Sequence, residues 1–130
     1  IKSVLSSGGN ITQGIVSAST GVNNNSSQFQ ISAPFQPGSS GSPVINKYGQ
    51  IIGVATSRIS DVEMVNATGQ VGQGLNFAIN GQTLKMFMDA NNVKYRSSSA
   101  TFSKEKSAED ISDDARKWTT VIECWGAAPR

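Results

Sequence analysis

The sequence predicts an all-β fold with one or two short helices after the sheet. Apolar runs of about four to eight residues alternate with clusters of Gly, Ser, Asn and Thr, which is the pattern of short strands joined by turns. Helical spacing of apolar residues occurs in two stretches, both in the C-terminal half. A length of 130 residues is typical of one domain.

The predicted strands are the apolar runs between these turn clusters. In order they are residues 11–19, 28–32, 43–46, 51–57, 75–79 and 119–124. Residues 46–49, Asn-Lys-Tyr-Gly, form a predicted hairpin turn in which Gly49 adopts positive φ. We expect the last strand to add to an exposed sheet edge.

Two helices are predicted from their caps and their spacing. The first follows Asn80 as N-cap and places three apolar side chains on one face, namely Leu84, Phe87 and Met88. The second follows Ser107, which begins a variant of the capping box, and aligns Ala108, Ile111, Ala115 and Trp118. We expect both helices to pack on the β-structure, with residues 91–106 as a polar linker and 107–130 as an appendix.

Composition excludes several classes of function. Eleven Lys and Arg against nine Asp and Glu give a net charge of +2, with the basic residues scattered, which argues against a nucleic-acid or membrane surface. No run approaches the roughly 20 apolar residues of a membrane helix. The single Cys124 allows no internal disulfide and no zinc site, so we expect no metal and no cofactor.

The run with the clearest chemical meaning is residues 35–45, Phe-Gln-Pro-Gly-Ser-Ser-Gly-Ser-Pro-Val-Ile. A serine attacks a carbonyl only when a rigid turn holds its hydroxyl out of the backbone beside amide N–H groups that receive the oxyanion. Gly38 and Gly41 permit such a turn around Ser40. The alternative reading of the run is an ordinary surface loop.

This run resembles the Gly-Asp/Asn-Ser-Gly-Gly-Pro motif of the chymotrypsin-like serine proteases, and its flanks resemble the bacterial HtrA/Deg branch. Three further segments are similar to strands of that branch in order and spacing. They are residues 11–18, Ile-Thr-Gln-Gly-Ile-Val-Ser-Ala; 49–56, Gly-Gln-Ile-Ile-Gly-Val-Ala-Thr; and 74–79, Gly-Leu-Asn-Phe-Ala-Ile. The resemblance implies that residues 1–90 are the second, C-terminal six-stranded-type β-barrel of a two-barrel protease, in incomplete form.

The resemblance implies a serine endopeptidase that works through an acyl-enzyme on Ser40. It makes the amide N–H groups of Gly38 and Ser40 the oxyanion hole. Ser39 lies where vertebrate proteases have an Asp that pairs with the new N-terminus, so activation by such a pair is not expected. Ser42 replaces the second glycine of the motif.

The same resemblance implies a substrate pocket formed by the residue before the turn and by two later strands. The residues at those positions are Phe35, Thr56, Ser57, Arg58, Leu75 and Asn76. Because no carboxylate lies among them, we expect the pocket to accept a small or medium apolar side chain. The alternative role of Phe35 and Leu75 is packing in the core. Residues 56–58 are expected to form an edge strand whose backbone pairs with substrate.

The chain has no histidine to accept the proton of Ser40, so by itself it is expected to be inactive. In the family, the His and Asp belong to the first barrel, which implies a fragment of an active enzyme; a peptide-binding module that does not cleave is the alternative. A Ser40–Lys47 dyad and a catalytic role for Asp61, Glu63 or Asp89 have no sequence signature.

The expected partners are a peptide or protein substrate and the missing first barrel. A half-enzyme would also expose apolar surface, which favours self-association. The resemblance further implies export to the periplasm or the medium.

Overall fold

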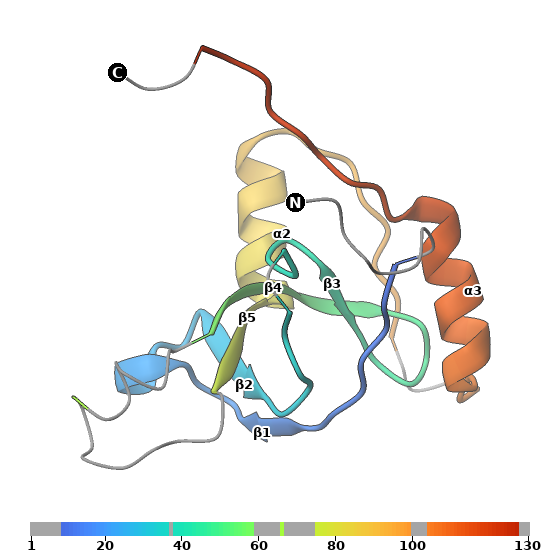
Figure 1. The fold of residues 1–130 in the computed structure, drawn as a ribbon, viewed down its shortest axis with the longest axis horizontal. Coiled ribbons are helices and arrows are strands. Elements are labelled where there is room, and N and C mark those ends of the chain that lie inside the picture. Colours follow the sequence, from blue (N-terminus) through green and yellow to red (C-terminus); the bar gives the residue numbers. More distant parts are fainter. Residues whose placement is uncertain (1–8, 37, 59–65, 67–74, 100–103, 128–130) are drawn as a thin grey trace.

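The computed structural model describes residues 9–36, 38–58, 66, 75–99 and 104–127. Its strands form one antiparallel sheet in the order β1-β2-β5-β4-β3 (Figure 1). The strands are β1 Val16–Ala18, β2 Gln28–Ile31, β3 Pro43–Ile45, β4 Ile51–Arg58 and β5 Asn76–Asn80. A short 3-10 helix, η1, spans Val22–Asn24. The predicted β-core is confirmed as an open sheet, and among the described strands β1 and β3 are edges that do not close a barrel.

A small apolar cluster lies on one face of the sheet. Phe29, Ile31 and Ala78 are buried in it, and four half-buried side chains pack against them, namely Ala33, Phe35, Val44 and Ile52. Side chains alternate across a strand, so β2 and β5 each direct every second residue into this cluster. Gly53 of β4 completes the fit, because a Cβ there would lie 2.6 Å from the Phe29 ring.

The described chain buries little of its apolar surface. Within it, six apolar residues are buried, whereas thirteen large apolar side chains are exposed. Such a balance is unusual for a domain that stands alone, since burial of apolar surface is the main favourable term in folding. Most of these side chains lie outside the strands, and they are available to pack against further protein.

Strand β1 is shorter than predicted. Residues 11–15 run beside residues 32–34 but are held by side chains as well as backbone: Ile15 N donates to Ser32 Oγ at 2.9 Å, and Thr12 Oγ1 donates to Pro34 O at 3.0 Å. Pro34 has no N–H to continue a ladder, which ends the regular pairing. Gly14 is required here because a Cβ would overlap the backbone N of Ala33.

The predicted turn between β3 and β4 is confirmed. Gly49 has a φ of 81°, and its N–H donates to Asn46 O at 3.0 Å. The Asn46 carboxamide oxygen accepts from the N–H groups of Tyr48 and Gln50, each at 3.0 Å. Asn46 thus fixes the hairpin with its side chain, as Asn does in many tight turns.

Both predicted helices are confirmed with their caps. Helix α2 spans Gly81–Ala90, and Asn80 caps it by accepting from Thr83 N at 2.9 Å. Helix α3 spans Ala108–Trp118, and Ser107 accepts from Asp110 N at 3.1 Å. Helix α2 contacts β4 and β5, as expected. Phe87, however, does not pack there, because it is 65% exposed.

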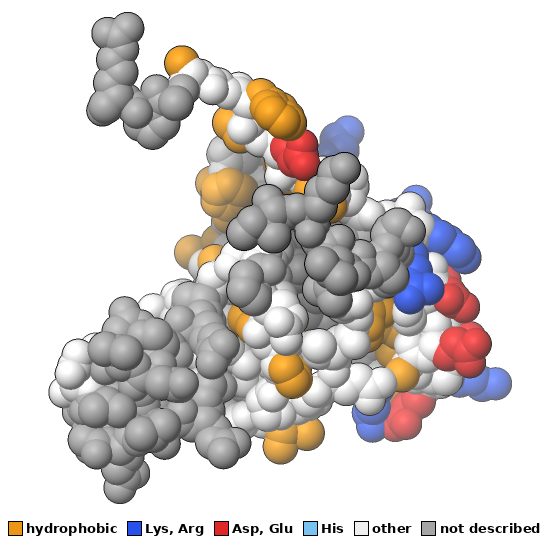
Figure 2. Space-filling model, in the orientation of Figure 1, with side chains coloured by type: hydrophobic (Ala, Val, Ile, Leu, Met, Phe, Trp, Pro, Cys, Tyr) orange, Lys and Arg blue, Asp and Glu red, His pale blue; other side chains and the backbone are white. Residues whose placement is uncertain are grey.

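The prediction of a strand at residues 119–124 is wrong. Residues 119–127 leave helix α3 as an extended tail without regular structure (Figure 1). Val121 and Ile122 are 82% and 91% exposed. Their β-propensity therefore meets no partner strand among the described residues, and propensity alone does not form a strand. The apolar groups of this tail project beyond the charged surface of α3 in Figure 2.

Helix α3 is attached to the β3–β4 hairpin by the residues just before it. Lys106 N donates to Lys47 O at 2.8 Å, and Lys47 forms an ion pair with Glu105. Inside the helix, Asp114 accepts from Lys106 Nζ at 3.2 Å. This short polar connection joins the start of α3 to the turn between β3 and β4.

The attachment of α3 is expected to weaken in acid. The hydrogen bond from Lys106 holds the pKa of Asp114 below its ordinary value of 3.8, with the charge of Lys106 as the next cause. A carboxyl with a lowered pKa in the folded state stabilises that state above its unfolded pKa, and this contribution is lost as pH falls through the folded pKa. Emission of Trp118, in a Trp125→Phe background, should therefore shift to longer wavelength below about pH 4.

The matched variants for this pH measurement are Asp114→Asn and Asp113→Asn. Asp113 makes no ion pair in the described part of the chain, so its variant should keep the acid shift. The Asp114 variant should lose the shift. An identical acid transition in both variants would contradict this role of Asp114.

Candidate active site

Ser40 lies on a tight turn that leads into β3. Gly38 and Gly41 flank it with φ values of 92° and 87°, a conformation that residues with a Cβ rarely adopt. The turn is closed by two backbone hydrogen bonds, from Ser39 N to Gln36 O at 2.9 Å and from Ser42 N to Ser39 O at 3.0 Å. The two glycines therefore produce the local geometry, and Ser40 is held exposed at its tip.

The turn is fixed to the sheet on its C-terminal side. Gly41 N donates to Ala55 O at 2.8 Å, and Ala55 N donates to Ser42 O at 2.9 Å. These bonds extend the β3–β4 pairing by one step beyond Pro43. Ala55 is 3% exposed, so the turn is anchored to a buried part of β4.

The hydroxyl of Ser40 donates to the backbone carbonyl of Thr56, with 3.0 Å between the two oxygens. Within the described part of the chain, neither the amide N–H of Gly38 nor that of Ser40 has a hydrogen-bond acceptor. Two such groups beside a serine hydroxyl can receive the charge that develops on a carbonyl oxygen during acyl transfer.

Ser39 has a structural part in the turn. Its Oγ accepts from Gln36 N at 3.1 Å, which closes the turn from the inside. Ser39 therefore fixes the loop through its side chain, whereas Ser40 presents its side chain outward. Pro37, between Gln36 and Gly38, lies outside the described residues.

The predicted pocket residues fall into two groups. Thr56 lies beside Ser40, and Ser57 and Arg58 continue β4, although their side chains are outside the described part. Phe35 is half-buried against the Phe29 cluster, as in the core-packing alternative. Leu75 is half-buried just before β5.

Asn76 is a buried polar residue with one unsatisfied atom. It is 4% exposed, and its Nδ2 donates to Ala33 O at 2.7 Å. Its Oδ1 is buried and has no hydrogen-bond partner among the residues that the structure describes. The structure thus gives Asn76 a bond that ties β5 to the segment before the Ser40 turn.

Lys47 and Asp89, two other candidate catalytic groups, bond to partners away from Ser40. Lys47 pairs with Glu105, and the hydrogen bond to Glu105 raises the pKa of Lys47 above its ordinary value of 10.5, so Lys47 is no base for Ser40 near neutral pH. Asp89 accepts from Tyr95 Oη at 3.2 Å at the end of α2. Asp61 and Glu63 lie outside the described residues.

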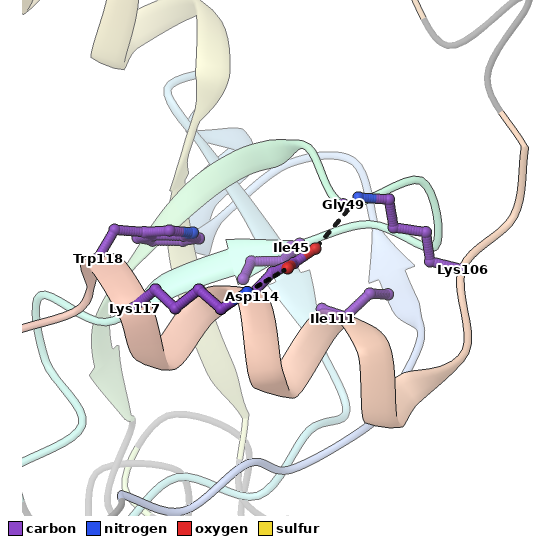
Figure 3. Close-up of a pocket in the computed structure, with 7 residues that line it drawn as sticks. All are labelled: Ile45, Gly49, Lys106, Ile111, Asp114, Lys117 and Trp118. Carbon is purple, nitrogen blue, oxygen red and sulfur yellow. Dashed lines mark hydrogen bonds and ion pairs between the residues drawn. The ribbon is translucent and has the colours of Figure 1, made fainter.

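A separate hollow of about 270 Å³ lies between the β3–β4 hairpin and α3 (Figure 3). Its lining residues are Ile45, Gly49, Lys106, Ile111, Asp114, Lys117 and Trp118. Lys106 and Lys117 both direct their ammonium groups to Asp114, at 3.2 and 3.5 Å. None of the predicted site residues lines this hollow, so it is distinct from the Ser40 turn.

The described part of the chain shows neither a metal-binding cluster nor a membrane-spanning helix. The described residues contain no cluster of three His, Cys, Asp or Glu side chains suited to a metal ion. None of the helices in the described ranges has the length and apolar character needed to cross a bilayer.

The Ser40 turn was predictable from the sequence because its glycines are local signals. The contact of Ser40 with the carbonyl of Thr56 was not, since it joins residues 16 positions apart through a backbone atom. The hydroxyl of Thr56 also makes a bond that the sequence did not indicate, to Phe77 O at 3.2 Å. Thr56 is a β-branched residue in a strand, and no sequence pattern predicts which acceptor its hydroxyl will bond.

Comparison with known proteins agrees with this geometry. Residues 3–54, which include the Ser40 turn, match the family model of a trypsin-like peptidase domain. This match supports a trypsin-like fold and a relationship to proteases.

The chain is also similar to a bacterial protein, the uncharacterized protein y4bJ of Sinorhizobium fredii. The two are 37% identical over 121 residues, which make up 93% of this chain and 19% of that protein. The chain thus spans about a fifth of the length of the curated relative it matches. No solved structure matches the chain.

Proposed function

We propose that this chain is the nucleophile-bearing part of a trypsin-like serine endopeptidase that cleaves peptide bonds through an acyl-enzyme on Ser40. The observation that carries the proposal is the glycine-flanked turn, which exposes the Ser40 hydroxyl near the amides of Gly38 and Ser40, and neither amide has an acceptor among the described residues. An acyl transfer needs a nucleophile and an oxyanion hole in this relation.

The base and its orienting carboxylate are proposed to come from another part of the same protein, the first barrel of a two-barrel fold. The chain has no histidine, and serine needs one or an equivalent base. The open sheet and the many exposed apolar side chains of the described residues support a missing packing partner. The much greater length of the bacterial relative is compatible with it.

We propose that this chain corresponds to the second barrel of a protease of the HtrA/Deg branch. Support comes from the four segments that resemble that branch, at residues 11–18, 35–45, 49–56 and 74–79. In the structure these segments supply β1, β3, β4 and β5 around one sheet.

The proposed substrate is an extended peptide that pairs with β4 beyond the end of β3. Pro43 pairs with Val54, so in the described structure residues 56–58 have no strand partner on the β3 side. An exposed strand edge next to a nucleophile suits binding of substrate by β-pairing. A small or medium apolar side chain remains the proposed preference.

Labelling of the full-length protein with a fluorophosphonate tests the proposal. An active serine enzyme is expected to form a covalent adduct, because the probe reacts with an activated hydroxyl. Heat-denatured protein is the control and should not react. A folded protein that binds peptides but neither reacts nor hydrolyses them would instead be the non-cleaving binding module.

A further inference from the structure

Thr56 interrupts the regular pairing of β4 with β5. Ala55 pairs with Ala78 and Ser57 pairs with Phe77, so no residue of β5 lies opposite Thr56. Two residues of β4 therefore face one residue of β5, which defines a β-bulge. Bulges bend the strand locally and re-aim the groups of the extra residue, and they are common beside active sites.

At the bulge, the backbone carbonyl and the side-chain hydroxyl of Thr56 bond to two different partners. Its backbone carbonyl accepts from Ser40 Oγ at 3.0 Å. Its side-chain hydroxyl donates to Phe77 O at 3.2 Å. Phe77 is 3% exposed, so this acceptor belongs to a well-buried part of the sheet.

The side-chain bond fixes the irregular part of the ladder to β5. A hydroxyl that bonds a nearby backbone carbonyl can stabilise a local departure from regular pairing. The hydroxyl of Thr56 therefore favours the bulged register over a regular one. In a regular register, the carbonyl of Thr56 would no longer be displaced toward Ser40.

We propose that Thr56 is a positioning residue that sets the place of the Ser40 hydroxyl. Its hydroxyl fixes the bulge to Phe77, and the bulge in turn holds the Thr56 carbonyl as the resting acceptor of the Ser40 proton. Three elements are coupled in this way: the buried strand β5, the bulge in β4 and the turn before β3. This inference rests on the proposed role of Ser40 as nucleophile.

The coupling has a consequence for reactivity. Before attack, the Ser40 hydroxyl must turn from the Thr56 carbonyl to a base that takes its proton, so the carbonyl defines the starting position of the hydroxyl. A displacement of about 1 Å at a reacting group can lower a rate by about 100-fold. Loss of the Thr56 hydroxyl should therefore slow the chemical step more than it weakens binding of substrate.

The test compares Thr56→Val with Thr56→Ser in the full-length protein. Valine keeps the branched shape and removes the hydroxyl, whereas serine keeps the hydroxyl. We expect Thr56→Val to lower kcat and the rate of fluorophosphonate labelling by about 10- to 100-fold, with KM changed less than about threefold. Thr56→Ser should restore labelling to within about threefold of the native rate.

Thr83→Val is the matched control, because Thr83 also donates its hydroxyl to a backbone carbonyl, Ser27 O at 3.5 Å, but lies in α2. It should leave the labelling rate unchanged. Equal rates for native protein and Thr56→Val would overturn the inference. So would equal losses in Thr56→Val and Thr56→Ser, because the hydroxyl would then have no part.

Crystal structures of the native protein and Thr56→Val separate the positioning role of Thr56 from the proposed catalytic role of Ser40. We expect the valine variant to lose the 3.0 Å contact between Ser40 Oγ and Thr56 O. Persistence of that contact would contradict the positioning role, whatever the activity. If the native protein is not labelled but the contact is lost in the variant, the proposed catalytic function fails and the structural coupling stands.

Discussion

Replacing Phe29 with alanine is expected to lower the free energy of unfolding of the sheet by about 3–5 kcal/mol. Phe29 is 7% exposed and lies in the cluster with Ile31 and Ala78. Its ring packs so closely on Gly53 that a Cβ there would lie 2.6 Å away. The described core contains few large side chains, so little remains to fill the cavity that alanine would leave.

Native-state hydrogen exchange of the β2 and β5 amides in the full-length protein measures this loss, because it reports the stability of the strands that carry Phe29 and its partner Ala78. Lys85→Ala is the control. Lys85 is an exposed, charged residue of α2, so its replacement should change the free energy by no more than about 0.5 kcal/mol. Equal protection in the two variants would show that Phe29 is not central to the core.

Replacing Ser40 with alanine is expected to lower kcat/KM for peptide hydrolysis by the full-length protein by about 10⁴- to 10⁶-fold. The hydroxyl is the proposed attacking atom, and no neighbouring group in the described structure can replace it. Only binding and the oxyanion hole would remain. The protein should stay folded, because Ser40 is exposed and the bonds that fix the turn are made by backbone groups and by Ser39.

Ser42→Ala is the matched control for this loss. Ser42 is an exposed serine two positions away, and it joins the β3–β4 pairing through its backbone carbonyl. Its replacement should keep kcat/KM within about threefold of the native value, as expected for a side chain without a role in the chemical step. Hydrolysis that survives in Ser40→Ala would assign the activity to another residue.

The elements that the sequence predicted well are those with local signals. Asn80 and Ser107 predict the starts of α2 and α3, because an N-cap side chain bonds only to the first turn of its own helix. Gly38, Gly41 and Gly49 predict turns, because a tight turn requires a positive φ that glycine adopts easily. The strands β2, β4 and β5 follow from apolar runs whose partners are present.

The elements that the sequence did not predict depend on distant partners. Residues 119–124 have strand composition, but no sheet edge meets them in the described structure. The attachment of α3 depends on Lys47 and Glu105, which are 58 positions apart. The bulge at Thr56 depends on how β4 aligns with β5, and alternation of apolar residues does not reveal one extra residue in a strand.

In the candidate site, too, features with a local sequence signal were predictable and features that depend on distant residues were not. The turn around Ser40 and its glycines could be predicted because one short run contains them. The surroundings could be predicted only through resemblance, and the structure gives Asn76 and Phe35 contacts in the core beside any role in binding. The base for Ser40 cannot come from a histidine of this chain, since it has none.

The role of Ser40 as nucleophile is tested most directly by locating the adduct that a fluorophosphonate forms on the full-length protein, by proteolysis and mass spectrometry. We expect modification of Ser40 and none of the neighbouring Ser39 and Ser42, because Ser40 alone of the three is proposed to meet a base and an oxyanion hole. Modification at a different residue, or a folded and unmodified protein, would contradict it.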